Sequence, residues 1–352
     1  MRPFLRDIRT RRLIASIVFV ALTVATIGIA TAVLRPESGG VAWGAFRRLE
    51  RDTVDVMLFG NSHAFSSIDP AVIWRTHGIP AFVHAGPVQM LDVTEYYIRE
   101  SLRTQKPRVV ALEMSSAAYT EDNFNAAFHT VNINSMPWSA NKLAAMVETT
   151  PPDMRVNILL ELWSSHVRWT ELRPRDFNLP GKQRGAPYLR GFVPNFRSEE
   201  VTAQPFVASA DDRAAAAESV AYNAGALVRI AELCADNDIG LLLVLTPTGP
   251  PEQYTHILEE AAGLLEGGAA DVRVLDLSAP DAVPGLSYET DFFDGGHLTW
   301  RGAEKASSAL AAFLADEWGL PDRRDDVTYG VWDADAALRD AFIERGDSRA
   351  TR

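Results

Sequence analysis

Cysteine is nearly absent from this chain, which has one, Cys234, among its 352 residues. A single cysteine cannot form an intramolecular disulfide, so a disulfide-stapled fold is excluded. Basic residues are also the minority, with 34 Lys and Arg against 46 Asp and Glu and a formal net charge of −12. Because sequence-independent nucleic-acid binding depends on neutralising phosphates, no nucleic-acid partner is expected. The remaining composition, 47% hydrophobic and 23% charged, is typical of a globular protein.

Charge is missing altogether from residues 13–34, which read LIASIVFVALTVATIGIATAVL. As a helix this stretch reaches about 33 Å, enough to cross a hydrocarbon core of about 30 Å. Five arginines and one aspartate precede it in residues 1–12. The positive-inside bias therefore predicts a single-pass plasma-membrane anchor, with the N-terminus in the cytoplasm and the body of the protein outside. The alternatives are a buried core helix and a cleaved signal peptide, whose apolar region is usually shorter, about 7–15 residues.

Short aliphatic runs follow this segment and alternate with helical patterns. Near-continuous aliphatic runs are typical of strands buried on both faces of a parallel sheet. The runs are residues 54–59, 81–85, 109–112, 241–245 and 272–277. The helical patterns are residues 70–77, 89–104, 212–237, 252–266 and 301–317. This order predicts an α/β fold with a doubly wound parallel sheet between two layers of helices.

Composition also suggests boundaries. Residues 35–52 read as a juxtamembrane linker and residues 53–320 as one domain. Residues 120–209 break the alternation, and we interpret them as an insertion, helical at 139–149 and 153–167, that either walls a ligand crevice or is purely structural. Residues 321–352 are highly charged and predict a solvated tail with one short helix near 333–344.

A serine follows the first predicted strand in the sequence Gly60-Asn61-Ser62-His63. The carboxyl ends of parallel strands open onto the functional crevice of such sheets. The glycine allows a sharp turn there, and the amide of Ser62 could donate to an oxyanion. Many serines in this position only cap a helix, so the motif alone is weak.

A second motif, Asp294-Gly295-Gly296-His297, follows the last predicted strand and precedes the last predicted helix. A nucleophilic serine needs a base to take its proton, and that base needs an acceptor that orients it. A histidine and an aspartate three residues apart in a glycine-rich loop can supply both. The alternative is a surface loop with a capping aspartate.

The two motifs together resemble the SGNH (GDSL-like) hydrolase superfamily, whose fold is a flavodoxin-like three-layer sheet. The resemblance covers roughly residues 54–120 and 215–318. It implies Ser62 as nucleophile, His297 as base and Asp294 as its partner. It also implies an oxyanion hole formed by the amides of Ser62 and Gly86, the latter following the second predicted strand.

The family's third block normally supplies an asparagine to the oxyanion hole, and this chain has Leu112-Glu113-Met114-Ser115-Ser116 instead. Losing one oxyanion donor typically costs about 10²–10³ in turnover, so a substitute is expected in an active enzyme. Ser115 is the first candidate by position. The other candidates are Ser116, Asn61 and Asn123, and Asn61 and His63 are also expected to line the substrate site.

With its single anchor, the chain resembles the membrane-tethered extracytoplasmic branch of the superfamily, which includes proteins similar to DltD and the alginate O-acetylation proteins. The resemblance implies a serine esterase or O-acyltransferase that acts on acyl esters of cell-envelope polysaccharide or other acylated polymers, alone or with a membrane acyl-transfer partner. No cofactor or metal is expected. The first alternative is a catalytically weak glycan-binding or assembly protein. The second is a metallohydrolase built on His63, His84, Asp294 and His297, although no HExxH-like spacing is present.

Overall fold

The computed structural model describes residues 8–34, 41–159, 166–178, 186–201, 207, 209–249 and 254–350. Parts of several predicted segments lie outside the described residues. These parts are residues 1–7 of the basic N-terminus, 35–40 of the linker, 160–165 of the predicted helix 153–167, 179–185, 202–206 and 208 of the insertion, 252–253 of the predicted helix 252–266, and 351–352 of the tail.

Five parallel strands form one sheet in the order β2-β1-β3-β4-β5. The strands are β1 Val56–Gly60, β2 Ala81–Ala85, β3 Val109–Glu113, β4 Gly240–Leu245 and β5 Val272–Asp276. Every predicted aliphatic run is a strand, so the prediction of an α/β fold with a parallel sheet is confirmed. The side chains of β1 to β4 are almost wholly buried, whereas the edge strand β5 is partly exposed.

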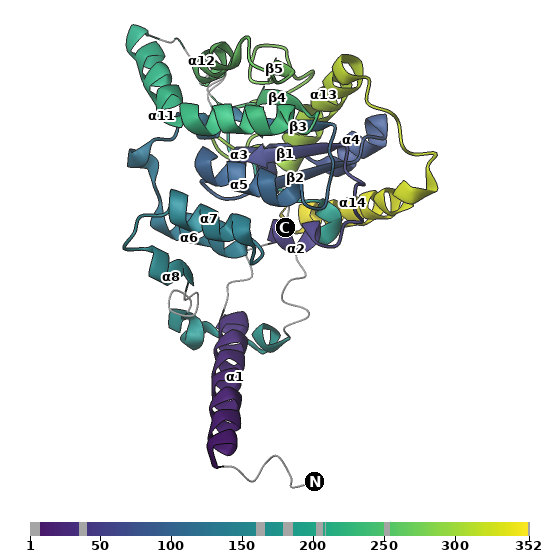
Figure 1. Cartoon of the computed structure of the whole chain (residues 1–352). Helices are drawn as coiled ribbons and strands as arrows, with labels where there is room; N and C mark the ends of the chain where they lie inside the picture. The colour runs from purple at the N-terminus through teal and green to yellow at the C-terminus, as the bar shows by residue number, and fades with distance from the viewer. Residues whose placement is uncertain are drawn as a thin grey trace.

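Helices cover both faces of this sheet (Figure 1). Met57 and Phe59 of β1 point into one core, and Val56 and Leu58 of the same strand point into the other, because successive side chains of a strand face opposite ways. The first core contains side chains of α2 Val41–Phe46, α5 Leu91–Ser101, α11 Ala210–Ala235 and α12 Thr255–Leu265. The second contains side chains of α3 Ser62–Ser67, α4 Pro70–His77 and α13 Trp300–Trp318.

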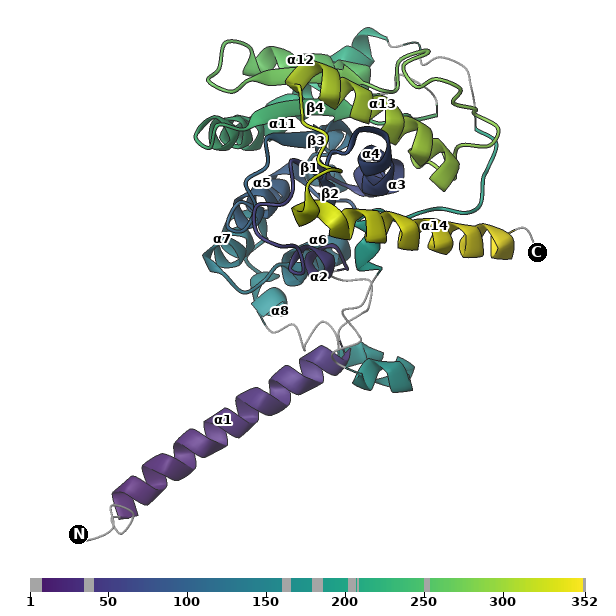
Figure 2. The same ribbon diagram turned by 90° about the vertical axis from the view of Figure 1, so that its right-hand side faces the viewer.

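Most of the N-terminal helix α1, Ile8–Leu34, projects away from the rest of the chain (Figure 2). The most apolar 18-residue stretch within residues 10–34 has a mean hydropathy of 2.5, and none of that stretch is buried. This exposure contradicts the alternative of a core helix. The helix is long and apolar enough to span a membrane.

The predicted linker is partly wrong, because residues 41–46 form helix α2 and belong to the domain. Trp43 and Phe46 are 2% and 4% exposed. Their rings surround His84 of β2, at centroid distances of 4.0 and 4.7 Å. Burial of these two aromatic side chains is enough to dock the short helix on the domain. The polar residues around them gave the segment the average composition of a linker.

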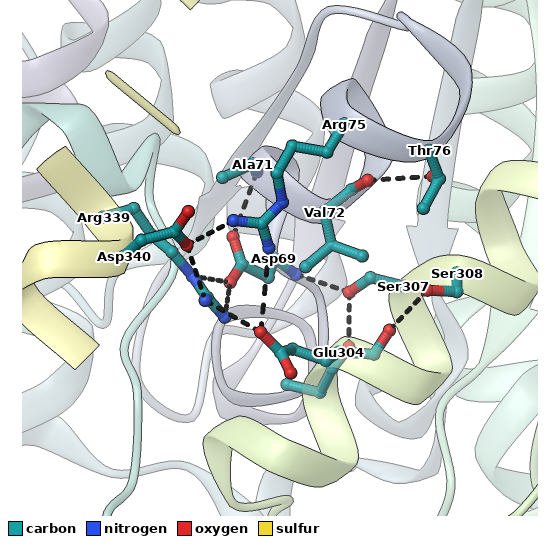
Figure 3. A network of polar contacts seen from close by, with 11 residues as sticks. Asp69, Ala71, Val72, Arg75, Thr76, Glu304, Ser307, Ser308, Arg339 and Asp340 are labelled. Carbon is teal, nitrogen blue, oxygen red and sulfur yellow. Dashed lines mark hydrogen bonds and ion pairs between the residues drawn. The ribbon is translucent and has the colours of Figure 1, made fainter. Parts of the chain in front are cut away.

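The prediction for the tail is wrong in part: the helix expected near 333–344 is present, but it is the longer helix α14 Gly330–Ala350, and it packs on the domain instead of lying in solvent. Trp332 and Ile343 of this helix are buried. Arg339, 2% exposed, donates from Nε to Oδ2 of the fully buried Asp69 at 2.6 Å (Figure 3). The other oxygen of Asp69 accepts from the amide of Ala71 and caps α4. The charged residues of the C-terminal segment thus include Arg339, whose guanidinium pairs with a buried carboxylate of the domain.

The described part of the region predicted as an insertion contains three short α-helices and several 3₁₀ turns. The helices are α6 Ala126–Ser135, α7 Ala140–Thr149 and α8 Arg155–Leu159. The turns are η3 Glu121–Asn123, η4 His166–Glu171, η5 Pro174–Phe177 and η6 Pro187–Leu189. The predicted helix 139–149 is confirmed, whereas 153–167 is α-helical only over 155–159 within its described part. The turns η2 Met114–Ala118 and η7 Val327–Tyr329 complete the described elements.

Candidate active site

Ser62 is the first residue of α3 and follows β1 by way of a tight turn. Gly60 has φ +151°, and a Cβ there would lie 2.8 Å from Cβ of Glu113, so only glycine fits. The side chain of Asn61 caps α3, its Oδ1 accepting from the amide of His63 at 2.8 Å. The amide of Ser62 lies in the first turn, where a helix supplies no backbone acceptor.

His297 and Asp294 lie in the loop between β5 and α13. Phe292 and Leu298 pair as an isolated antiparallel bridge on either side of them, and the amide of Phe293 donates to the carbonyl of His297 at 2.8 Å. The amide of Gly249, beyond β4, donates to the carbonyl of Gly295 at 2.9 Å. The loop is therefore stabilised by hydrogen bonds within itself and by one hydrogen bond to the segment that follows β4.

The three residues form one continuous hydrogen-bonded chain. Nε2 of His297 lies 2.7 Å from Oγ of Ser62. Nδ1 of the same ring lies 2.8 Å from Oδ1 of Asp294 and 2.9 Å from its Oδ2. With Nδ1 protonated toward the carboxylate, Nε2 is the free acceptor that a serine proton requires.

The Asp294 carboxylate is held in its charged form. Burial acts to raise the pKa of this carboxyl, but hydrogen bonds from the amide of Gly296 and from His297 outweigh it and bring the pKa below its usual value. The amides of Gly296 and His297 both donate to Oδ1, at 2.8 and 2.9 Å. An ionised carboxylate at this position stabilises the imidazolium that forms when His297 takes a proton.

A second histidine, His63, lies beside this chain, with its ring centroid 5.2 Å from that of His297. Only 7% of the residue is exposed, and burial, with the nearby His297, lowers the pKa of His63 to about 4. His63 is therefore neutral at pH 7 and adds no charge next to the base. An added Cβ at Gly296 would lie 3.1 Å from Cε1 of the His63 ring, a tight contact that requires a small shift of the ring.

A buried carboxyl that the sequence analysis missed lies beneath the serine. Oε2 of Glu113, at the end of β3, accepts from Oγ of Ser115 at 2.5 Å. The Asn61 amide nitrogen in turn donates to Ser115 Oγ at 3.0 Å and to the Tyr119 hydroxyl at 3.2 Å. Burial raises the pKa of Glu113 to about 7. Its place directly after a predicted strand was the available signal, as it was for Ser62.

This network contradicts two of the expected roles. Asn61 is fully buried, so it does not line a substrate site but holds the turn that carries Ser62. Ser115 is 1% exposed and its hydroxyl donates a hydrogen bond to Glu113, so this hydroxyl is not a free oxyanion donor. Ser116 donates to the carbonyl of Glu113, and Oδ1 of Asn123 accepts from the amide of Thr120, the N-cap of the turn η3.

Gly86 lies where the resemblance places it, after β2, but its amide is engaged. It donates to the carbonyl of Gly60 at 3.4 Å and so extends the pairing of β1 with β2. A side chain at this position would lie 2.2 Å from Oδ1 of Asn132 and 2.7 Å from Oε1 of Gln89. The insertion helix α6, which carries Asn132, therefore closes over this end of the sheet.

Of the histidines proposed as metal ligands, His63 and His297 are neighbours, but His84 lies elsewhere. His84 is fully buried among aromatic rings, with Nδ1 3.0 Å from Oγ of Ser101, and burial lowers its pKa to about 3. Within the described ranges, no group of three or more His, Cys, Asp and Glu side chains is placed to hold a metal ion. The geometry thus gives the metallohydrolase alternative no ligand set there.

Comparisons with known proteins add no relative to this site. No protein-family model, curated protein or solved structure matches the chain.

Proposed function

We propose that this protein is a membrane-anchored serine esterase or O-acyltransferase of the SGNH type. The observation that carries the proposal is the hydrogen-bonded chain from Ser62 through His297 to Asp294, with contacts of 2.7 and 2.8 Å. In this chain the aspartate orients the histidine ring, and the free ring nitrogen faces the serine hydroxyl. This is the arrangement that a serine nucleophile and its general base require.

In this mechanism Oγ of Ser62 attacks the acyl carbonyl while Nε2 of His297 takes its proton. The amide of Ser62 donates to the resulting oxyanion, and His297 then protonates the departing alcohol. The acyl group stays on Ser62 as an ester. Water or a hydroxyl of an acceptor, activated by His297 in the reverse sense, then releases it as an acid or as a new ester.

The proposed substrates are acyl esters of cell-envelope polysaccharides or other acylated polymers. Two features support this class: the resemblance in the two motifs, and the apolar helix α1, which would hold the domain at a membrane surface. A membrane acyl-transfer partner is compatible with the same arrangement.

Labelling with a fluorophosphonate probe tests the nucleophile. Full-length protein in detergent should be labelled, and Ser62→Ala should abolish labelling. Ser308→Ala is the matched control, because its hydroxyl only bonds back to the carbonyl of Glu304 within α13. An unlabelled wild-type protein, or equal labelling of Ser62→Ala, would contradict the proposal. Envelope ester content in cells that carry wild type or Ser62→Ala then tests the substrate class.

A second candidate, a glycan-binding or assembly protein with little catalysis, is favoured by one observation. Of the three expected oxyanion donors, the Gly86 amide and the Ser115 hydroxyl are both engaged elsewhere. Binding of envelope polysaccharide that Ser62→Ala leaves unchanged, with no measurable ester turnover, would support this second function over the first.

A further inference from the structure

A short segment of the insertion region lies against the end of the apolar helix α1. The turns η4 and η5 both contact α1, although more than a hundred residues separate them in sequence. Nη1 of Arg168 donates to the carbonyl of Leu34, the last residue of α1, at 2.7 Å. Both views show these turns beside the C-terminal end of α1 (Figures 1 and 2).

This juxtamembrane segment, residues 168–177, is folded around a buried ion pair. Nη2 of Arg168 lies 3.2 Å from Oδ1 of Asp176, which is 1% exposed. The other oxygen of Asp176 accepts from the amide of Arg173 at 2.8 Å. The charged side chains of Arg168 and Asp176 are thus paired with each other and with the backbone of the segment or of α1.

Two aromatic side chains of the same segment point outward. Trp169 is 68% exposed and Phe177 is 62% exposed. The segment thus exposes two large apolar side chains and buries its aspartate. This is the arrangement expected of a surface that contacts another phase or molecule.

The contact with Leu34 fixes where this surface lies. If α1 spans a bilayer, its uncharged stretch ends at Leu34, so this residue lies at the boundary between hydrocarbon and headgroups. Trp side chains are enriched at that depth because their rings are apolar while their N–H stays hydrated. A cation on the last carbonyls of a helix is also favoured by the helix dipole.

We propose that the juxtamembrane segment lies in the headgroup layer of the lipid bilayer at the C-terminal end of α1, with Trp169 and Phe177 inserted among the lipids. It would be a second membrane contact besides α1 itself. The proposal depends on α1 being a retained anchor and is independent of the proposed chemistry.

Spin labelling tests the depth of these side chains. Full-length protein in phosphatidylcholine–phosphatidylglycerol nanodiscs is labelled at Trp169→Cys or at Phe177→Cys, each made in a Cys234→Ala background, since Cys234 is the one native cysteine. Leu264→Cys is the matched control. It is a 40% exposed apolar side chain on α12, at the end of the molecule away from α1 (Figures 1 and 2).

We expect labels at 169 and 177 to be relaxed several-fold more by oxygen, which partitions into lipid, than by an aqueous nickel chelate. The order should reverse at 264. Higher accessibility to the nickel chelate at all three positions would overturn the proposal. Low accessibility to both reagents at 169 and 177 would also overturn it, because a protein partner would then cover them.

Intrinsic fluorescence gives a second, label-free measurement. In nanodiscs with acyl chains brominated near the headgroup, wild-type fluorescence should be quenched more than that of Trp169→Phe. Trp138→Phe, which removes another exposed tryptophan (58%), is compared in parallel. Equal quenching of wild type and Trp169→Phe would contradict insertion of Trp169 even if the cysteine variants fail to fold.

Discussion

Nε2 of His297 lies 2.7 Å from Oγ of Ser62, although 235 positions separate the two residues in the chain. The parallel sheet brings them together, because all five strands end at the same edge. Ser62 follows β1, an interior strand of the sheet, and the His297 loop, bonded to Gly249 beyond β4, reaches over that edge. Such edges are where ligands of open α/β sheets bind.

The tautomer of His297 depends on Asp294, so Asp294→Asn should reduce activity far more than stability. An asparagine at this position can present N–H to the ring, which favours the tautomer with Nε2 protonated and unable to take the serine proton. We expect a fall of about 10³–10⁴-fold in kcat/KM for p-nitrophenyl acetate. Asp281→Asn, an exposed residue earlier in the same connection, is the control and should keep full activity. Equal activities of the two variants would remove Asp294 from the mechanism.

Glu113 should make the fold less stable as pH rises. Its folded-state pKa of about 7 lies above the ordinary value of 4.5, so between these values the folded chain binds more protons than the unfolded chain. The unfolding free energy therefore falls across that window, by up to about 3 kcal/mol for this group. Glu113→Gln should lose this slope and gain stability over wild type at pH 8. Urea unfolding from pH 4.5 to 8 measures the difference, and parallel curves for the two proteins would refute it.

Gly60 and Gly263 should respond in opposite ways to alanine. At Gly60 a Cβ would meet Cβ of Glu113 at 2.8 Å, in a backbone conformation that favours glycine, so we expect a loss of about 2–4 kcal/mol. At Gly263, inside α12, nothing lies within 4 Å, and alanine should stabilise by about 1 kcal/mol. Thermal unfolding of both variants measures this. A neutral Gly60→Ala would show that the turn before Ser62 is less constrained than its contacts imply.

The pair Arg339–Asp69 should contribute much more to stability than a surface pair. Arg339→Ala leaves the carboxylate of Asp69, fully buried, without its cation, and such losses cost about 3–5 kcal/mol. Arg213→Ala removes a pair with Glu259 in which both side chains are mostly exposed, and should cost at most about 1 kcal/mol. Denaturant midpoints of the two variants compare them. Similar midpoints would mean that α14 is not bound to the domain as the ion pair suggests.

Local sequence patterns were sufficient for the strands, the larger helices and the apolar N-terminal helix. Aliphatic runs are buried in any fold that the chain adopts, so they can be recognised without knowing their partners. Asp69 marks the start of α4 and Gly78 its end, through contacts with residues nearby in sequence. The same holds for Asp294 and His297, which are three residues apart and meet within one loop.

Tertiary structure decided everything that depends on distant partners. Trp43 lies in a segment with the composition of a linker, and Arg339 lies in one with the composition of a charged tail. In the folded chain both side chains are buried, Trp43 against His84 and Arg339 against Asp69. Contacts with partners distant in sequence also explain two further findings. The hydroxyl of Ser115 donates to Glu113 within a network that includes Asn61, and Arg168 donates to the last carbonyl of α1. A sequence specifies which groups must be buried or paired, but only the packed chain determines which partner satisfies each of them.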